Sequence, residues 1–211
     1  MSRYVGPSCR LCRREATKLF LKGTKCLTEK CPVERRAYPP GQHGQTGGRP
    51  RKASEYSKQL REKQKVKRIY GLTERQFRNT FDGVIREPGV KGTNLLIALE
   101  SRLDNIVHRM GFASSRKAAR QLIAHGHVEV NGHRVDVPAY RVLPGQEVRM
   151  APASRELVAV KLAQEAATRG QPVSWLSVDA DKAAGRMVER PTREAIPINA
   201  QEQLIVELYS K

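Results

Sequence analysis

The sequence predicts an α+β protein with a small cysteine-rich N-terminal segment, an extended basic arm, a mostly helical lobe and an inserted small αα-β module. Three observations lead to this fold class. All four cysteines lie within the first 31 residues, apolar residues recur at helical spacing after residue 54, and valines alternate across residues 128–137. At about 100–200 residues per domain, a chain of 211 residues can form two small domains.

Residues 1–36 are predicted to form a metal-binding knuckle. Their cysteines make two close pairs, and thiolates at such spacing are typical ligands of structural Zn²⁺. A 4Fe–4S cluster is the alternative, because four cysteines also hold such a cluster. Disulfides in a secreted protein are a further alternative, although clustered thiols favour a reducing, cytoplasmic environment. The predicted ligands are Cys9, Cys12, Cys26 and Cys31.

Residues 37–53 are predicted to form an extended linker. Pro39, Pro40, Gly41 and Gly44 make a helix or a sheet interior unfavourable here, because proline lacks an amide donor and glycine loses much backbone entropy on ordering. The segment is therefore expected to lie along a partner or in solvent.

Residues 54–100 and 151–211 are predicted to form the mainly helical lobe, closed by the C-terminal segment. Ser54 is expected to cap a basic helix, and Thr73 with Gln76 has the spacing of a capping box at the start of the next helix. Ser154 is expected to cap a later helix, whereas the run Leu204 to Leu208 is typical of strand or core material.

A continuous amphipathic core helix is predicted to run from Leu95 through Gly111, since leucine, isoleucine and valine recur there every three or four residues. The side of this helix away from the core is expected to be exposed. The residues placed on that side are Arg102, Asp104, Asn105, His108 and Arg109.

Residues 101–150 are predicted to form the inserted αα-β module. Ser114 is expected to cap its second helix, which ends at Gly126. The pair Asn131-Gly132 between alternating valines is a strong hairpin signal and favours a type I′ turn.

The charge of the chain indicates a polyanionic partner. The net charge is +18, and residues 151–211 are neutral with eight basic and eight acidic residues, so the whole surplus lies in residues 1–150. No run of apolar residues approaches the ~18 of a membrane span, and no signal peptide is apparent. Aromatic residues make up only 5%, which argues against binding single strands by base stacking. A folded RNA, recognised by shape and phosphate contacts, is the expected partner.

Several segments resemble a known family. The stretch SRLDNIVHRMGFASSRKAARQLIAHGHVEVNGHRVDVPAYRVLPGQEVRM resembles the S4-type RNA-binding module, which also occurs in pseudouridine synthases, some tRNA synthetases and a heat-shock RNA binder. The segments RYVGPSCRLCRRE, RRAYPPGQHG, LREKQKVKRIYGLTERQF and NAQEQLIVELYS are similar, in order and across nearly the full length, to the bacterial ribosomal protein S4 (uS4) family.

The resemblance implies a structural protein of the 30S subunit, not an enzyme, that binds the 5′ domain of 16S rRNA early and nucleates assembly of the subunit body. It also implies a contact with ribosomal protein S5 that affects translational accuracy, and a position near the mRNA path. The rRNA contacts it implies are Arg10, Arg13, Arg14, Arg35, Arg36, Lys58, Arg61, Lys65, Arg68, Ser114, Arg116, Lys117, Arg120 and Arg134. The residues expected near the mRNA are Arg49, Arg51 and Lys52.

Two other classes of protein stay open at this point. A non-ribosomal RNA-binding factor of the heat-shock or stalled-ribosome type could use the same module, but it would not explain the N-terminal segment, linker and C-terminal segment. An RNA-modifying enzyme would need a second domain with a nucleophile, acid or base in place, and residues 151–211 contain no histidine or cysteine.

Overall fold

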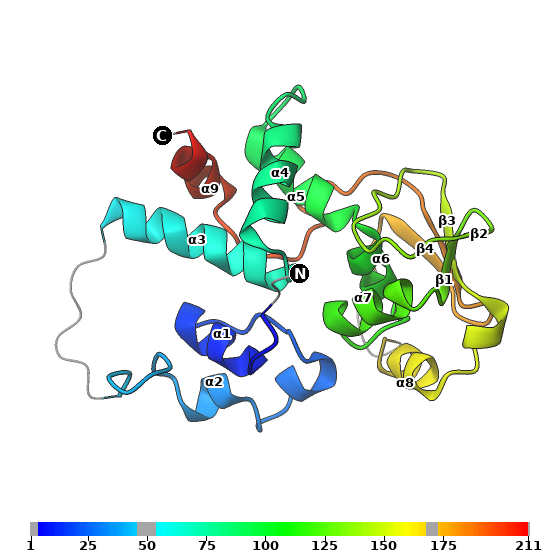
Figure 1. The fold of residues 1–211 in the computed structure, drawn as a ribbon, viewed down its shortest axis with the longest axis horizontal. Coiled ribbons are helices and arrows are strands. Elements are labelled where there is room, and N and C mark those ends of the chain that lie inside the picture. The colour runs from blue at the N-terminus through cyan, green and yellow to red at the C-terminus, as the bar shows by residue number, and fades with distance from the viewer. Residues whose placement is uncertain (1–3, 46–53, 168–172, 211) are drawn as a thin grey trace. The chain divides into compact units, whose positions relative to one another are not determined.

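The computed structural model describes residues 4–45, 54–167 and 173–210, and the chain divides into two compact units (Figure 1). The first unit comprises Met1–Gly92 with Ile198–Lys211, and the second comprises Thr93–Pro197. The described part of the first unit is helical, whereas the second combines helices with an antiparallel sheet. The predicted α+β class is therefore confirmed. None of the described helices is long and apolar enough to cross a membrane.

The helices of the first unit begin where local capping signals place them. The Ser54 hydroxyl accepts from the amide of Ser57 at 3.2 Å, and Thr73 and Gln76 exchange both bonds of the capping box at 3.3 Å. Both predicted helix starts are confirmed. The elements of this unit are α1 (Ser8–Glu15), η1 (Gly23–Cys26), α2 (Pro32–Arg35), α3 (Glu55–Ile69), α4 (Glu74–Val84) and α9 (Glu202–Tyr209).

The C-terminal segment closes the first unit as a helix. The run Leu204 to Leu208 lies in α9, so the prediction of strand material was wrong there. Helix α9 lies beside α3 (Figure 1), and Gln59 donates to Glu207 at 3.0 Å. The ring of Tyr209 stacks on Phe81 with 4.7 Å between centroids. The apolar spacing of α9 therefore serves packing against helices rather than against a sheet.

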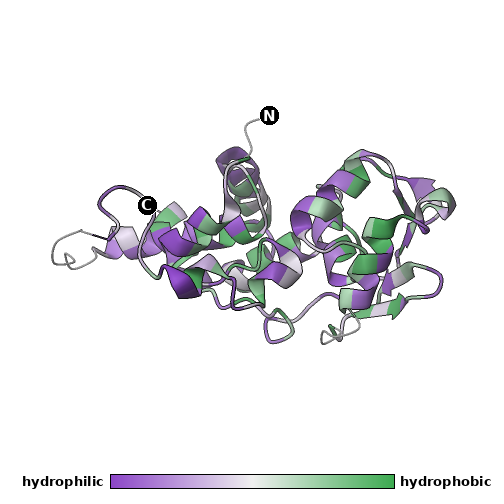
Figure 2. Ribbon diagram, turned by 90° about the horizontal axis from the view of Figure 1, so that it is seen from below, coloured by the Kyte–Doolittle hydropathy of each residue, from purple (hydrophilic) through white to green (hydrophobic). Residues whose placement is uncertain are grey.

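The second unit contains a five-stranded antiparallel sheet in the order β2-β1-β3-β5-β4, with α6 and α7 on one of its sides (Figure 1). Its core combines side chains from these helices with those of the strands and α8. In Figure 2 the ribbons of both units alternate between purple and green, as expected for amphipathic elements packed on a core. The elements are α5 (Lys91–Glu100, its first two residues in the first unit), α6 (Leu103–Arg109), α7 (Arg116–Ala124), β1 (Val128–Val130), β2 (His133–Arg134), β3 (Glu147–Met150), η2 (Pro152–Ser154), α8 (Val158–Ala167), β4 (Leu176–Asp179) and β5 (Ala184–Met187).

The placement of residues 151–197 differs from the sequence prediction, which put them in the lobe with residues 54–100. Strand β5 pairs with β3 of the module, with Gly185 opposite Val148. Trp175 and Met187 are buried in the same core as the module's own strands. Residues 151–197 therefore extend the module's sheet, and only the chain from Ile198 onward belongs to the first unit. Ser154 lies in η2 and not at the cap of α8.

The predicted continuous helix from Leu95 through Gly111 is interrupted at Ser101 and Arg102. Arg102 has an extended backbone, and it forms an isolated β-bridge with Arg141. The chain therefore makes two helices, α5 and α6. Periodicity alone could not show this break, because the apolar spacing continues across it. Long-range pairing with residue 141 decides it.

One turn prediction and one helix-cap prediction had different outcomes. Asn131 and Gly132 have φ of 49° and 82°, and both values are positive as a type I′ turn requires, so this prediction is confirmed. The cap of α7 is Ser115, whose hydroxyl accepts from the amide of Ala118, and not Ser114. Ser114 is instead exposed just before the helix.

Candidate nucleic-acid interface

The predicted metal site is wrong. Across residues 4–45, 54–167 and 173–210, no group of three or more Cys, His, Asp or Glu is placed to hold a metal ion. Cys12, Cys26 and Cys31 are buried and Cys9 is half-buried. Burial raises the pKa of the Cys12 thiol, which favours the protonated form over the thiolate that a metal requires. Neither zinc nor a 4Fe–4S cluster is supported, and the buried cysteines pack as small apolar side chains.

Arg13 ties the start of the linker to α1. Its Nε donates to the carbonyl oxygens of Arg36 at 3.1 Å and Tyr38 at 3.0 Å. Its guanidinium lies 4.6 Å from the centroid of the Tyr38 ring. Arg13 was predicted to contact rRNA, but the structure gives it a clear internal task, which is to fix residues 36–38 against the helix.

Glu15 organises the face between α1 and α3. Its side chain is only 3% exposed, and it accepts hydrogen bonds from Arg61, at 3.3 Å, and from Arg68. Sequence reasoning missed this residue. A signal was present, because Glu15 is the one acidic residue among the first 28. A lone acid in a basic segment indicates an internal partner for cations from elsewhere in the fold.

The four α3 residues predicted to contact rRNA all have acidic partners within the first unit. Besides the two arginines on Glu15, Lys58 pairs with Glu55 at 2.6 Å and Lys65 pairs with Glu62 at 2.7 Å. The cationic character of α3 is therefore lower than its sequence indicates. Their exposure differs, from a Lys58 side chain that is 52% exposed to a Lys65 side chain that is 15% exposed.

The other basic residues predicted in the N-terminal segment lie on its surface. Arg10, Arg14, Arg35 and Arg36 are all exposed. Arg10 and Arg14 lie on α1, Arg35 lies on α2, and Arg36 directly follows α2. Arg49, Arg51 and Lys52 lie outside the described residues.

The N-terminal end of α7 presents three of the five predicted contacts of the module. Ser114 and Lys117 are exposed and Arg116 is half-buried. The Nε of Arg116 donates to Oδ1 of Asn105 on α6 at 2.8 Å. Burial, together with the charge of Arg116, lowers the pKa of His108 to about 4, so the imidazole is neutral at pH 7. The positive charge at this end of α7 therefore comes from Arg116, Lys117 and the helix dipole.

Arg120 lies inside the module, in contrast to its predicted position on the RNA. It is 9% exposed and donates to Asp104 at 3.3 Å. Arg102 donates two hydrogen bonds to the same carboxylate, at 3.0 and 2.8 Å. Arg102, Asp104 and Asn105 were expected on the exposed side of the helix, but all three are buried. This face of α6 therefore lies inside the module and not in solvent.

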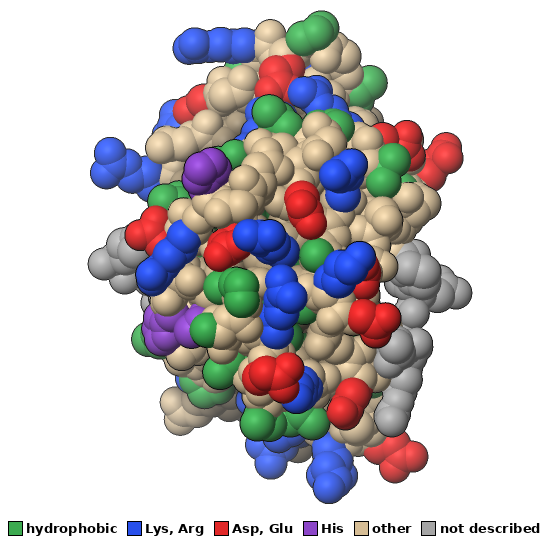
Figure 3. Space-filling view, turned by 90° about the vertical axis from the view of Figure 1, so that its right-hand side faces the viewer, with side chains coloured by type: hydrophobic (Ala, Val, Ile, Leu, Met, Phe, Trp, Pro, Cys, Tyr) green, Lys and Arg blue, Asp and Glu red, His purple; other side chains and the backbone are tan. Residues whose placement is uncertain are grey.

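The sheet side of the second unit carries both signs of charge. Figure 3 shows blue Lys and Arg side chains interleaved there with red Asp and Glu. Arg149 pairs with Glu129 at 2.7 Å. The exposed Arg134 donates to the carbonyl of His125 at 3.2 Å. A Cβ at Gly126 would lie 1.9 Å from the guanidinium nitrogens of Arg134, so a larger residue there would displace this side chain. The α7 end suits phosphate better than this mixed surface does.

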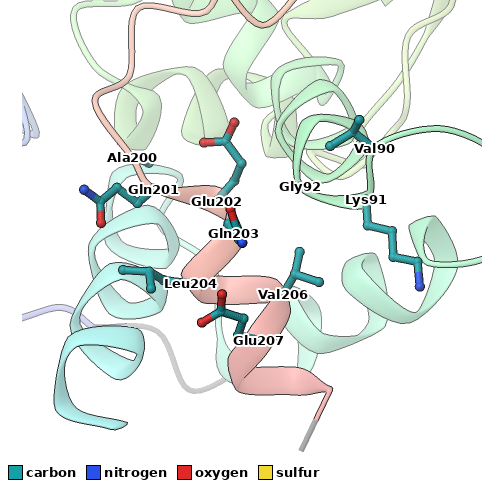
Figure 4. A pocket seen from close by; sticks show the side chains of 10 residues that line it. All are labelled: Val90, Lys91, Gly92, Ala200, Gln201, Glu202, Gln203, Leu204, Val206 and Glu207. Atoms are coloured by element: carbon teal, nitrogen blue, oxygen red, sulfur yellow. The ribbon is translucent and has the colours of Figure 1, made fainter. Parts of the chain in front are cut away.

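An open groove that is less basic than the surfaces described above lies in the first unit, between the start of α5 and α9 (Figure 4). Gly92 permits the close approach, because a Cβ there would lie 2.6 Å from Cγ of Glu202. Apolar and acidic side chains line the groove together. The lining residues are Val90, Lys91, Gly92, Ala200, Gln201, Glu202, Gln203, Leu204, Val206 and Glu207.

Comparison with known proteins covers the whole chain. Residues 3–100 match the family described as ribosomal protein S4/S9 N-terminal domain, and residues 101–148 match the S4 domain, as the predicted module required. The small ribosomal subunit protein uS4 of Thermus thermophilus is 52% identical over 211 residues, which is the full length of both chains. The proteins of the same name from Thermodesulfovibrio yellowstonii and Syntrophomonas wolfei are 55% and 54% identical, again over the full length of both chains.

Proposed function

The chain belongs to the uS4 family of small ribosomal subunit proteins, and from this premise we propose that it binds the 5′ domain of 16S rRNA and nucleates assembly of the body of the 30S subunit. Its role is that of a structural ribosomal protein and not of an enzyme, and its place is on the cytoplasmic ribosome. A non-ribosomal factor that shares only the module would not explain the match of residues 3–100.

The observation that carries the rRNA proposal is the cationic end of α7. Arg116 and Lys117 lie where the first amides of an α-helix add a partial positive charge. The arginines on the surface of α1 and α2 and the partly exposed Lys58 and Arg61 would add further phosphate contacts. Arg13 and Arg120 would support RNA binding indirectly. Arg13 holds residues 36–38 against α1, and Arg120 pairs with Asp104 inside the module.

Binding to the transcribed 5′ domain of 16S rRNA across a salt series, with excess tRNA as competitor, tests this proposal. We expect log K to fall linearly with log salt concentration, because phosphate contacts release counterions. Lys117→Ala should make that slope shallower by roughly 0.7–0.9, the contribution of one phosphate contact. Lys182→Ala is the matched control, since Lys182 is exposed in the same unit and pairs with Asp179 on the sheet. Complete displacement by tRNA would contradict specific binding.

We also propose that the groove in Figure 4 contributes to the contact with ribosomal protein S5. Glu202 and Glu207 would repel a phosphate backbone, and apolar Val90 and Val206 suit a protein surface. We expect Val90→Asp to weaken binding of purified S5 at least roughly tenfold, as a buried unpaired charge should. Val90 is 71% exposed, so the change should leave the fold intact. Val188→Asp, in the second unit, is the control, and an equal effect of both changes would contradict this site.

For the linker we propose proximity to the mRNA path, carried by Arg49, Arg51 and Lys52. The support is the family resemblance together with the basic charge of these residues. Cross-linking of a photoreactive mRNA to reconstituted 30S subunits should decrease when the three are changed to alanine together. Unchanged cross-linking would remove them from the path.

A further inference from the structure

The side chain of Asn105 is held in one orientation inside the second unit. It is 1% exposed, and its Nδ2 donates to the backbone oxygen of Glu100 at 2.9 Å and to Oε2 of Glu100 at 2.6 Å. A backbone carbonyl can only accept a hydrogen bond, so the amide nitrogen must face Glu100. The opposite atom, Oδ1, is therefore an acceptor that faces away from Glu100.

Oδ1 of Asn105 accepts a hydrogen bond from Nε of Arg116 at 2.8 Å. Nε lies in the plane of the guanidinium, so a bond at this atom restricts the orientation of the whole planar group. Arg116 is the first residue of α7, whereas Asn105 lies on α6. The contact between the two helices thus restrains the orientation of the cation at the start of α7.

Glu100 is itself held in place by Arg109. Its side chain is fully buried, and Arg109 grips its carboxylate with two bonds of 3.0 and 2.8 Å. The four residues form a continuous chain of hydrogen bonds from Arg109 through Glu100 and Asn105 to Arg116. Because the inner members are buried and their hydrogen bonds are short, the orientation of Asn105 is strongly determined.

We propose that Asn105 is a positioning residue for rRNA recognition, which holds the guanidinium of Arg116 in a preformed orientation at the N-terminal end of α7. The inference rests on the proposed rRNA-binding function of that end. An arginine that is already ordered loses less conformational entropy when it meets a phosphate. Removing the Asn105 side chain should therefore weaken rRNA binding although Asn105 itself is buried and touches no nucleotide.

A double-mutant cycle on the full-length protein tests this inference. Affinity for the 16S 5′ domain is measured for Asn105→Ala, Arg116→Ala and the double variant, at a temperature where circular dichroism shows all of them folded. We expect Asn105→Ala to weaken binding roughly 3- to 10-fold in the native background. In the Arg116→Ala background the same change should have no further effect. An equal loss in both backgrounds, or no loss in either, would overturn the inference.

Ser101→Ala is the matched control for general destabilisation. Ser101 is 3% exposed and its hydroxyl donates to the carbonyl of Ile97 at 2.7 Å. It should reduce stability without changing rRNA affinity, and a loss equal to that of Asn105→Ala would refute a specific role for Asn105. If Asn105→Ala does not fold, Asn105→Ser replaces it, because the shorter side chain has no atom at the position of Oδ1 and so cannot hold Nε of Arg116.

The cycle also separates this inference from the proposed function. If Arg116→Ala leaves affinity unchanged, the α7 end is not an rRNA contact and both proposals fall. If Arg116→Ala weakens binding and Asn105→Ala does not, the rRNA contact stands and the positioning role falls. An independent readout is the Nε–H signal of Arg116 in ¹⁵N spectra, which should be slowly exchanging in the native protein and exchange-broadened in the Asn105 variants.

Discussion

Asp104→Ala is expected to lower the free energy of unfolding of the second unit by about 3–5 kcal/mol, the usual cost of removing one partner from a buried ion pair. The Asp104 carboxylate is buried and accepts from Arg102 with two bonds and from Arg120 with one. Both arginines are buried as well. Without the carboxylate their charges would remain in a region of low dielectric constant, where an uncompensated charge is costly.

Urea denaturation followed by tryptophan fluorescence would measure this effect. Trp175 is the single tryptophan of the chain and is 1% exposed in the core of the second unit, so its signal reports on that unit. Asp136→Ala, at an exposed position of the same unit, is the control and should change stability by less than about 0.5 kcal/mol. A loss below about 1 kcal/mol for Asp104→Ala would show that Asp104 does not organise the arginines.

Glu15→Ala is expected to produce the second-largest effect, a loss of roughly 1–3 kcal/mol in the stability of the first unit. This loss is smaller than that expected for Asp104→Ala because solvent screens the ion pairs. The Arg61 and Arg68 side chains are 32% and 21% exposed. The Glu15 side chain itself is buried, and its loss removes the ionic link between α1 and α3. We therefore expect α1 to open locally more often than α3 does.

Amide hydrogen exchange of the full-length protein would detect this opening. Exchange across α1 should accelerate in Glu15→Ala, whereas exchange across α6 and α7 should stay unchanged. Glu29→Ala is the matched control, because Glu29 is an exposed acid of the same N-terminal segment. Unchanged protection of α1 in Glu15→Ala would show that other contacts hold the N-terminal segment on α3.

Local features of the fold were predictable because their causes lie within a few residues. The capping box of Thr73 with Gln76 and the turn at Asn131-Gly132 both depend on a side chain or a backbone angle in the turn itself. The S4-type module was also recognisable, since its motif occupies one continuous stretch. In the capping box and the hairpin turn, neighbouring residues carry the whole interaction.

Predictions that depended on distant residues were less successful. Cysteine spacing indicated a metal site, but spacing does not determine whether the thiols converge or are desolvated in the fold. The apolar repeat from Leu95 onward predicted one helix, whereas the β-bridge between Arg102 and Arg141 divides it. Leu204 to Leu208 could suit a strand or a helix, and packing of α9 on α3 decided for the helix.

The sequence by itself determined the family, the α+β class, the positive charge of residues 1–150 and the starts of helices with their own caps. The tertiary structure alone decided which of the basic residues are available to RNA. Glu15 is 46 residues from Arg61 along the chain, and Asp104 is 16 residues from Arg120, yet each pair forms an ion pair. Ion pairs and burial depend on separation in space, and no local pattern specifies which distant charges the fold will bring together.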